Sequence, residues 1–407
     1  MSDEQISVFV ELEAAIDLVK ENFLSIKKNV GVDEVIMARK GLAAMLELLQ
    51  DPFTNYIPPP QLEQYKSRKV ESVVGIGLQC EQDSTGKLRI VSALKDGPAD
   101  LPGIQTGFEI SEIDGRQTRD ENMQRINADL NGAEGTFASL NVIGSNGDSE
   151  TIEIERRPVD VDYLDFQLLT DNILFVRIAW FSGTCYQTFL EKLEQYIENG
   201  IKGLILDLRS NSGGSIISTR NIFSSLCDQE VMYYGMKIGE KNTKDRVLGE
   251  HRFSLPLVVI INAATFSAGE VLAGALKDHG RAVIVGTRSG GKGSMQQVFP
   301  LGGQIGGALR ITTATNCTPQ GHIVQDHGIT PDHEVEQICS ELFVHDGPQN
   351  ISAEGRAFRS KVRLEKLQVK YGIDRVQSVW NAGDLQMNRA LVELQALIAK
   401  EVDANQS

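Results

Sequence analysis

A serine that opens a predicted helix and a lysine in a glycine-rich loop are the side chains best placed for chemistry. Ser267 follows an apolar strand and precedes a helical stretch that runs to about Asp278. The N-terminus of a helix offers unpaired amides and a positive dipole end to a developing oxyanion. Ser267 could therefore act as the nucleophile of an acyl-transfer reaction.

The same serine also fits a purely structural role. Glu270 stands three residues after Ser267, and Ser-x-x-Glu is the capping-box pattern of helix N-termini. On this local pattern alone, an N-cap serine is several times more common than a nucleophile. The pattern leaves both roles open.

A serine nucleophile needs a base, and histidine is the usual one. His279 lies at the far end of the helix that Ser267 opens, about 18 Å away at 1.5 Å per residue. The other histidines lie in polar loops, where we expect surface residues: His251, His322, His327, His333 and His345. Lys292, in the next strand-end loop, remains as the candidate base. A lysine pKa is ordinarily about 10.4, so Lys292 must be buried to act as a base.

The loop that carries Lys292 has a second interpretation. Gly286 and Gly291-Lys292 have the spacing of a phosphate-binding loop. That motif needs Ser or Thr after the lysine to hold magnesium, and the chain has Gly293 there. Nucleotide binding is therefore disfavoured.

Alternating strands and helices from about residue 160 must position these side chains. Apolar strands are predicted at 173–178, 204–208, 255–261 and 282–285, with helices at 186–198 and 267–278. Apolar strands separated by helices predict a buried, largely parallel sheet. In such sheets the functional loops follow the carboxyl ends of strands. Three unusual loops stand at such ends: 211–214, 262–267 and 286–293.

The flanking regions have a different character. Residues 3 to about 50 have a helical apolar pattern, and short strands between turn residues predict a β-rich domain over 71–158. The last 65 residues are polar and helical, with an apolar stripe through Leu391, Leu394 and Leu397. We predict four parts: 1–70, 71–158, 159–337 and 338–407.

Composition excludes several classes of protein. The 407 residues include 40 basic and 55 acidic side chains, a net charge of −15, which disfavours nucleic acid as a partner. Apolar runs reach about eight residues, well below the roughly 20 of a membrane span. Five scattered cysteines without a CxxC pair imply neither a zinc site nor a disulfide framework. No metal or organic cofactor is implied.

The acidic N-terminal segment lacks the basic and apolar parts of a signal peptide. The chain as written is therefore expected in the cytoplasm. The periplasm or another exported compartment is the alternative if a signal has been removed.

Residues 262–278 and 291–296 together resemble the signature of the C-terminal processing peptidases, or tail-specific proteases, of the Ser/Lys-dyad family S41. The resemblance implies that Ser267 is the nucleophile, Lys292 the general base and Gln296 the residue that orients the lysine. If the turn after Lys292 is helical, Gln296 lies on the lysine's face. The resemblance also implies an oxyanion hole of backbone amides, one from Ala268 and one from Gly213 or Gly214.

The resemblance covers about residues 14 to 335. It implies an α/β protease core with βα repeats like those of ClpP and crotonase, an embedded β-rich PDZ domain, and helical N- and C-terminal segments. Gly75-Ile76-Gly77-Leu78 resembles the loop with which a PDZ domain binds a terminal carboxylate. A strand with a bulge is the alternative there. The chain departs from the family at Phe266, where alanine is usual, and at Gly269, where a small hydroxyl residue is usual.

The function that follows is a serine endopeptidase acting through an acyl-enzyme. Its substrates would be proteins with unstructured, apolar C-terminal tails, which the PDZ domain would recognise. The family resemblance also suggests a homodimer formed by the helical flanks. A catalytically silent PDZ scaffold that only binds C-terminal tails is the alternative.

Overall fold

The computed structural model describes residues 34–51, 53–62, 73–121, 123–159, 161, 163–236, 243–246, 252–337, 343 and 352–406. The chain divides into two compact units. The first combines residues 1–65 with 295–313, and the second combines 66–294 with 314–407. The part of the predicted helical region 3–50 that precedes residue 34 lies outside the described residues.

The first unit contains helix α2 (Glu34–Glu47) and a small antiparallel sheet. Strand β1 (Asn55–Ile57) pairs with the start of β18 (Ala308–Cys317), and β17 (Ser294–Pro300) pairs with β18 as well. A small apolar cluster of Ile57, Leu62 and Ala308 lies beneath them. The helix agrees with the apolar stripe in the sequence, whereas the sheet was not predicted.

A six-stranded sheet forms the centre of the second unit. All its neighbouring strands are parallel except the first pair, which is antiparallel. In spatial order the strands are β10 (Leu164–Leu168), β11 (Ile173–Ile178), β12 (Gly203–Asp207), β15 (Leu257–Ile261), β16 (Val283–Gly286) and β19 (His333–Glu334). Every residue of β12 and β15 is buried. The prediction of a buried, largely parallel sheet is confirmed.

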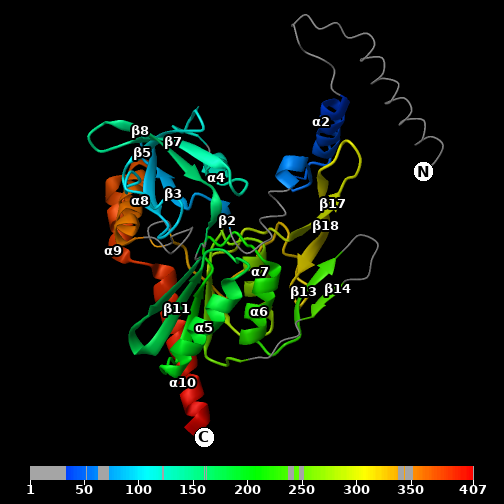
Figure 1. Ribbon diagram of the computed structural model, residues 1–407. Helices are drawn as coiled ribbons and strands as arrows, with labels where there is room; N and C mark the ends of the chain where they lie inside the picture. The colour runs from blue at the N-terminus through cyan, green and yellow to red at the C-terminus, as the bar shows by residue number, and fades with distance from the viewer. Residues whose placement is uncertain are drawn as a thin grey trace, which may run out of the picture. The chain divides into compact units, whose positions relative to one another are not determined.

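Helices cover both faces of this sheet (Figure 1). Helices α5 (Cys185–Glu198), α6 (Ile216–Leu226) and α7 (Ala268–Asp278) lie on one side, and α10 (Leu385–Gln406) lies on the other. Leu394 of α10 is fully buried against Ile205 and Val258. The apolar stripe in the last helix therefore packs on the central six-stranded sheet.

A buried ion pair ties the end of β12 to the start of α10. Arg209 donates to both carboxylate oxygens of Asp207, at 2.9 and 2.8 Å, and to those of Asp384, at 2.8 and 2.7 Å. Burial alone would raise the pKa of Asp207, but the charge and hydrogen bonds of Arg209 outweigh burial and hold that pKa below its usual range. The ion pair gives Asp207 and Arg209 a structural role at the end of β12.

Asp207→Asn is expected to lower the free energy of unfolding by about 3–5 kcal/mol at pH 7, because it removes one partner of a buried ion pair. A carboxyl group whose pKa is lowered in the folded state stabilises the fold at pH values above its ordinary pKa of about 3.9. This stabilisation is lost as the pH falls through the folded-state pKa. Urea unfolding at pH 7 and pH 3 should therefore show a smaller difference between wild type and variant at pH 3.

The exposed Asp165 on β10 supplies the control for this experiment. Asp165→Asn is expected to change the unfolding free energy by less than about 0.5 kcal/mol. Equal losses for the two variants would show that the Asp207 ion pair contributes no more than a surface charge does.

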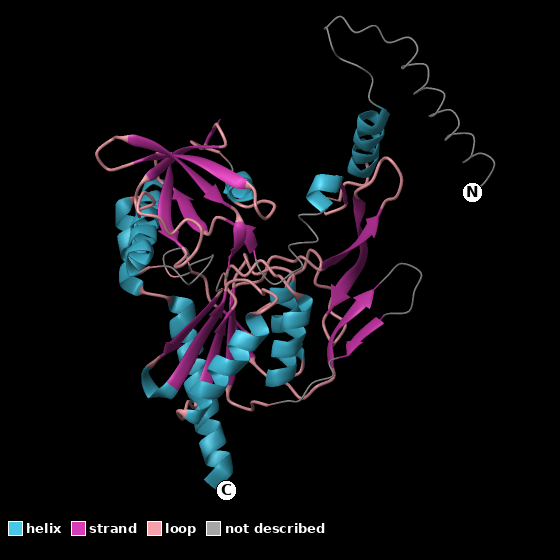
Figure 2. Ribbon diagram, in the orientation of Figure 1, coloured by secondary structure: helices cyan, strands magenta, loops and turns pink. Residues whose placement is uncertain are grey.

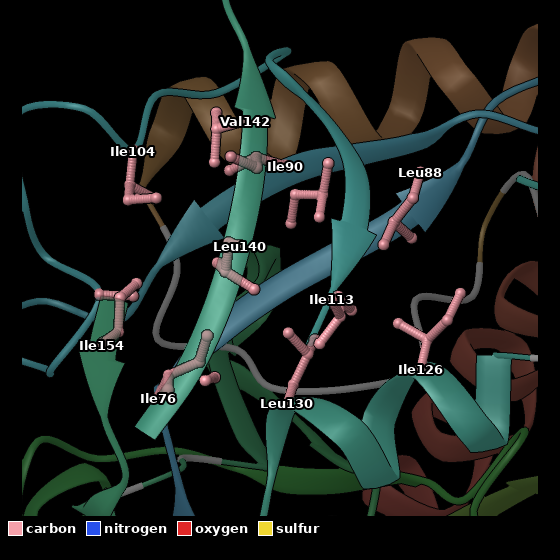
Figure 3. Close-up of a cluster of buried hydrophobic side chains, with 13 residues drawn as sticks. Ile76, Leu88, Ile90, Ile104, Ile113, Ile126, Leu130, Leu140, Val142 and Ile154 are labelled. Carbon is pink, nitrogen blue, oxygen red and sulfur yellow. The ribbon is translucent and has the colours of Figure 1, made fainter. Parts of the chain in front are cut away.

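Within residues 78–155 the strands form an antiparallel sheet in the order β3-β4-β5-β7-β8. Figure 2 shows these strands in magenta. The main elements of this region are β3 (Leu78–Gln82), β4 (Leu88–Ala93), β5 (Glu109–Ile113), β6 (Arg116–Gln117), α4 (Met123–Leu130), β7 (Phe137–Ile143) and β8 (Ser149–Glu155). Apolar side chains from the strands and from α4 fill the space between them (Figure 3).

One predicted strand in this region divides into two. The apolar run from Val73 to Leu78 breaks at Gly77, where φ is +69°. Its first half is β2 (Val73–Gly75), which pairs with β9 (Arg157–Val159), and its second half begins β3, which pairs with β4. The positive φ at the glycine lets the chain leave one sheet and enter the next.

The remaining elements complete the second unit. Strands β13 (Val231–Met236) and β14 (Thr243–Arg246) pair with each other, and β13 pairs with the end of β18. A 3₁₀ turn (Thr170–Asn172) precedes β11, and helices α8 (Ala353–Tyr371) and α9 (Ile373–Ala382) precede α10. Among the described residues, no helix combines the length and apolar character that crossing a membrane requires.

Candidate active site

Ser267 occupies a strained position between β15 and α7. Its backbone has φ 54° and ψ −118°, whereas an ordinary N-cap residue is extended. A non-glycine residue rarely adopts such angles, and strain of this kind concentrates at functional sites. The backbone of Ser267 therefore differs from that of a simple helix cap.

The carboxylate of Glu270 lies at the centre of the site. The side chain is fully buried and accepts four hydrogen bonds. One oxygen, Oε2, accepts from the amides of Ser267 at 2.9 Å and Lys292 at 2.8 Å. The other, Oε1, accepts from Gly291 N and Ser289 Oγ, each at 2.6 Å. A single buried charge thus holds together the two loops that carry the candidate nucleophile and base.

The sequence indicated only part of this role. The capping-box spacing predicted the contact between Glu270 and Ser267 N. The bonds to Ser289, Gly291 and Lys292 join residues that are distant in sequence and follow no periodic pattern.

The loop that carries Lys292 is anchored on its other side by the segment after β18. Ser289 exchanges hydrogen bonds with Ile329, and the carbonyl of Gly291 accepts from Asp326 N at 2.8 Å. The Lys292 side chain is half-buried. Because this loop directs amides to a carboxylate and leads into strand β17, it contradicts the phosphate-loop alternative, which requires a following helix.

Phe266, one of the departures from the family pattern, is accommodated by a glycine in the same loop. A Cβ on Gly290 would lie 1.9 Å from the Phe266 ring. Gly290 N also donates to the carbonyl of Thr265 at 2.9 Å. The larger side chain before Ser267 thus adds a contact between the two loops.

The turn after β12 lies close to Ser267. A Cβ on Gly213, where φ is +111°, would lie 2.8 Å from Ser267 Cβ and 3.3 Å from Ala268 N. The amide of Gly213 donates to Asn211 Oδ1 at 2.8 Å. The amides of Ala268 and Gly214 find no acceptor among the residues that the structure describes. Two unpaired donors near the candidate nucleophile are what an oxyanion hole needs.

Gly213→Ala is expected to lower kcat by at least about 10²-fold, because a 1 Å displacement of reacting groups has that effect. The new methyl group would overlap Ser267 Cβ at 2.8 Å, and alanine is strained at φ +111°. Cleavage rates of a fluorogenic peptide would measure the change. Gly200→Ala is the control for backbone strain at a positive φ alone, because no atom lies within 4 Å of the added methyl group. Equal rates for both variants would contradict the close approach of Gly213.

Comparisons with known proteins identify the family of this chain. Residues 172–335 match the family described as peptidase family S41. A carboxyl-terminal-processing protease of Picosynechococcus is 32% identical over 308 residues, which cover 74% of this chain and 73% of that protein. This chain belongs to peptidase family S41.

A second relative and a solved structure are also similar to this S41 peptidase. A carboxyl-terminal-processing protease of Synechocystis is 31% identical over 299 residues, covering 72% of this chain and 70% of the relative. The solved structure of a photosystem II D1 C-terminal processing protease superposes with a TM-score of 0.50 at 26% identity. That match covers 83% of this chain and 94% of the other.

Gln296 belongs to the first compact unit of this S41 peptidase. It lies on strand β17, so the helical turn considered for it does not form. Its Nε2 donates to Thr312 Oγ1 at 3.1 Å. The role of Gln296 in orienting Lys292 stays a prediction.

The histidines that the structure describes have partners away from Ser267. His279 caps the far end of α7, and its Nε2 lies 2.7 Å from the carbonyl of Val231. His322 and His333 face carboxylates at 3.8 and 3.3 Å. His251 and His345 lie outside the described residues. His327 Nδ1 lies 2.7 Å from the carbonyl of Gln325, and no described histidine forms a hydrogen bond with Ser267.

The loop Gly75-Ile76-Gly77-Leu78 opens onto a groove of about 530 Å³ between β3 and α4. The amide of Ile76 donates to the carbonyl of Leu130 at 3.3 Å. The amide of Gly77 has no acceptor among the described residues. Gly77, Leu78, Leu94 and Leu130 line the groove.

Proposed function

We propose that this S41 peptidase is a serine endopeptidase that cleaves proteins near unstructured, apolar C-terminal tails. Ser267 is the nucleophile and Lys292 the general base. The single observation that supports this assignment most is the shared carboxylate oxygen of Glu270, which accepts from the amides of both residues. The strained backbone of Ser267 adds to it.

The proposed reaction proceeds through an acyl-enzyme. Neutral Lys292 accepts the proton of Ser267 Oγ as the oxygen attacks a peptide carbonyl. The amides of Ala268 and Gly214 donate to the resulting oxyanion, and Lys292 returns its proton to the leaving amine. Water then attacks the ester, again with Lys292 as base. Between the two glycines of the turn, Gly214 is preferred because the amide of Gly213 already donates to Asn211.

We further propose that residues 71–158 act as a PDZ-like domain that binds the substrate tail. Among the described strands, β3 is the last of its sheet, so its outer edge can accept a peptide as an added strand. The unpaired Gly77 amide stands where a terminal carboxylate would be bound, and Leu94 and Leu130 supply an apolar surface for the last side chain. The relatives are named carboxyl-terminal-processing proteases, and that name fits this substrate class.

An unfolded reporter protein tests the proposal. One reporter ends in an apolar tail with a free carboxylate, and its matched control has the same tail amidated. Incubated with the full-length enzyme and followed by intact mass, the first should be cut about 10-fold faster, and a fluorophosphonate probe should label Ser267.

Equal cleavage of the two reporters would overturn tail recognition. Binding of the free-carboxylate tail with neither cleavage nor labelling would favour the silent scaffold. Labelling of a different serine would overturn the assignment of Ser267.

A further inference from the structure

Helix α8 carries an unusual concentration of positive charge for this acidic protein. It has six basic residues against two acidic ones, a net charge of +4 in a chain of −15. Arg359, Arg363 and Lys366 are spaced at i, i+4 and i+7, so they share one side of the helix. All three line the groove between β3 and α4.

Contacts with β3 fix which side of the groove the cations occupy. Arg359 Nη2 donates to Gln79 Oε1, and Arg363 Nε donates to Glu81 Oε1 at 3.3 Å. Gln79 and Glu81 point to one face of the strand, because alternate residues of a strand point to opposite faces. Leu78 and Cys80 point to the other face and pack on the apolar core of the sheet. The cations of α8 therefore lie on the face of β3 opposite to the core.

Charge in the groove is also unbalanced. Among the residues that the structure describes, the groove is lined by one acidic side chain, Glu81, and by three cations. Arg359 is buried, whereas Lys366 is exposed. An anionic side chain that enters the groove would meet at least one solvent-accessible cation.

We propose that Arg363 and Lys366 select substrate tails with an acidic residue at the penultimate position. This inference rests on the proposed binding of tails to β3. A peptide added to the edge of β3 alternates its side chains as the strand does. If the last, apolar side chain points to Leu94 and Leu130, the penultimate side chain points to the face where α8 lies. Aspartate or glutamate there complements the cations.

Peptide binding to the full-length Ser267→Ala protein, which cannot form an acyl-enzyme, tests this specificity. Two fluorescent decapeptides with the same apolar last residue carry Glu or Gln at the penultimate position. Fluorescence anisotropy should give about 5-fold tighter binding of the Glu peptide at low salt, as expected for partly exposed charge pairs. The preference should shrink as salt screens the charges.

Variants of α8 show which of its cations cause the preference for the Glu peptide. Arg363→Gln with Lys366→Gln should bring the ratio of the two dissociation constants close to one, and Lys366→Gln alone, at an exposed site, should reduce it partly. Lys361→Gln is the matched control, because Lys361 is exposed and lies about 200° around the helix from Arg363. It removes the same charge and should leave the ratio unchanged.

The binding experiment gives different results depending on which proposal is wrong, tail binding by the PDZ-like domain or selection by α8. If amidated peptides bind as well as free ones, or no peptide binds, tail recognition by the PDZ-like domain is wrong. If binding needs the free carboxylate but Glu and Gln peptides bind alike, only the role of α8 is overturned. A preference that Lys361→Gln removes equally would also overturn it, since general charge would then be the cause.

Discussion

Lys292→Ala is expected to reduce peptide cleavage by at least about 10³-fold, because removing the general base of a nucleophilic serine has effects of this size or larger. Ser267→Ala should reduce it by at least as much. The double variant should be no slower than Ser267→Ala, since residues that act as one unit are not additive. Steady-state cleavage of an apolar-tailed reporter would measure all three.

The fold should survive these changes. Neither side chain belongs to the buried core, and the amides of both residues still donate to Glu270 in the variants. Lys202→Ala is the matched control, because Lys202 is exposed and lies just before strand β12. Its cleavage rate should equal that of the wild type.

The pH dependence of kcat/KM distinguishes a lysine base from a histidine base. A lysine base is active when neutral, so kcat/KM should rise as pH increases towards the lysine pKa. A histidine base would give a limb near pH 6.5 instead. Lys292→Ala activity within 10-fold of wild type, or a limb near pH 6.5, would contradict the assignment of the base.

Local patterns were sufficient to predict the protease sheet. Strands β11, β12, β15 and β16 are short apolar runs bounded by turn residues, and their continuous burial produces that pattern. The pairing of β1 with β18 was not predicted. It joins distant segments, as where Tyr56 pairs with Leu309, and β18 is only partly buried, so it shows no strong periodicity.

Residue types alone located the candidate nucleophile and base but not the contacts that organise them. The choice between Gly213 and Gly214 depends on which amide the Asn211 side chain accepts from, and two adjacent glycines carry no information about that. The division of the 73–78 run at Gly77 similarly depends on the separate partners of its halves, β9 and β4. In both cases the deciding contact comes from elsewhere in the chain.

Glu270→Gln is expected to lower kcat by about 10²-fold with little change in KM, because the variant displaces Ser267 and Lys292 without altering the proposed tail-binding groove. Each carboxylate oxygen of Glu270 accepts two hydrogen bonds. Glutamine keeps one such oxygen and replaces the other with an NH₂ group. In either orientation this donor faces at least one backbone amide, which must move away or stay unpaired.

The variant should also be less stable, so its effect on catalysis needs a separate control. An unpaired buried donor costs about 1–3 kcal/mol of unfolding free energy. Ser289→Ala removes a donor from Oε1 but leaves the two bonds from Ser267 and Lys292 to Oε2 intact. It should lose stability in the same range while kcat falls by less than about 5-fold. Urea unfolding and steady-state kinetics on both variants would separate the two effects. If kcat falls equally in both, Glu270 stabilises the fold without positioning the dyad; a larger fall in Glu270→Gln means that the carboxylate aligns nucleophile and base.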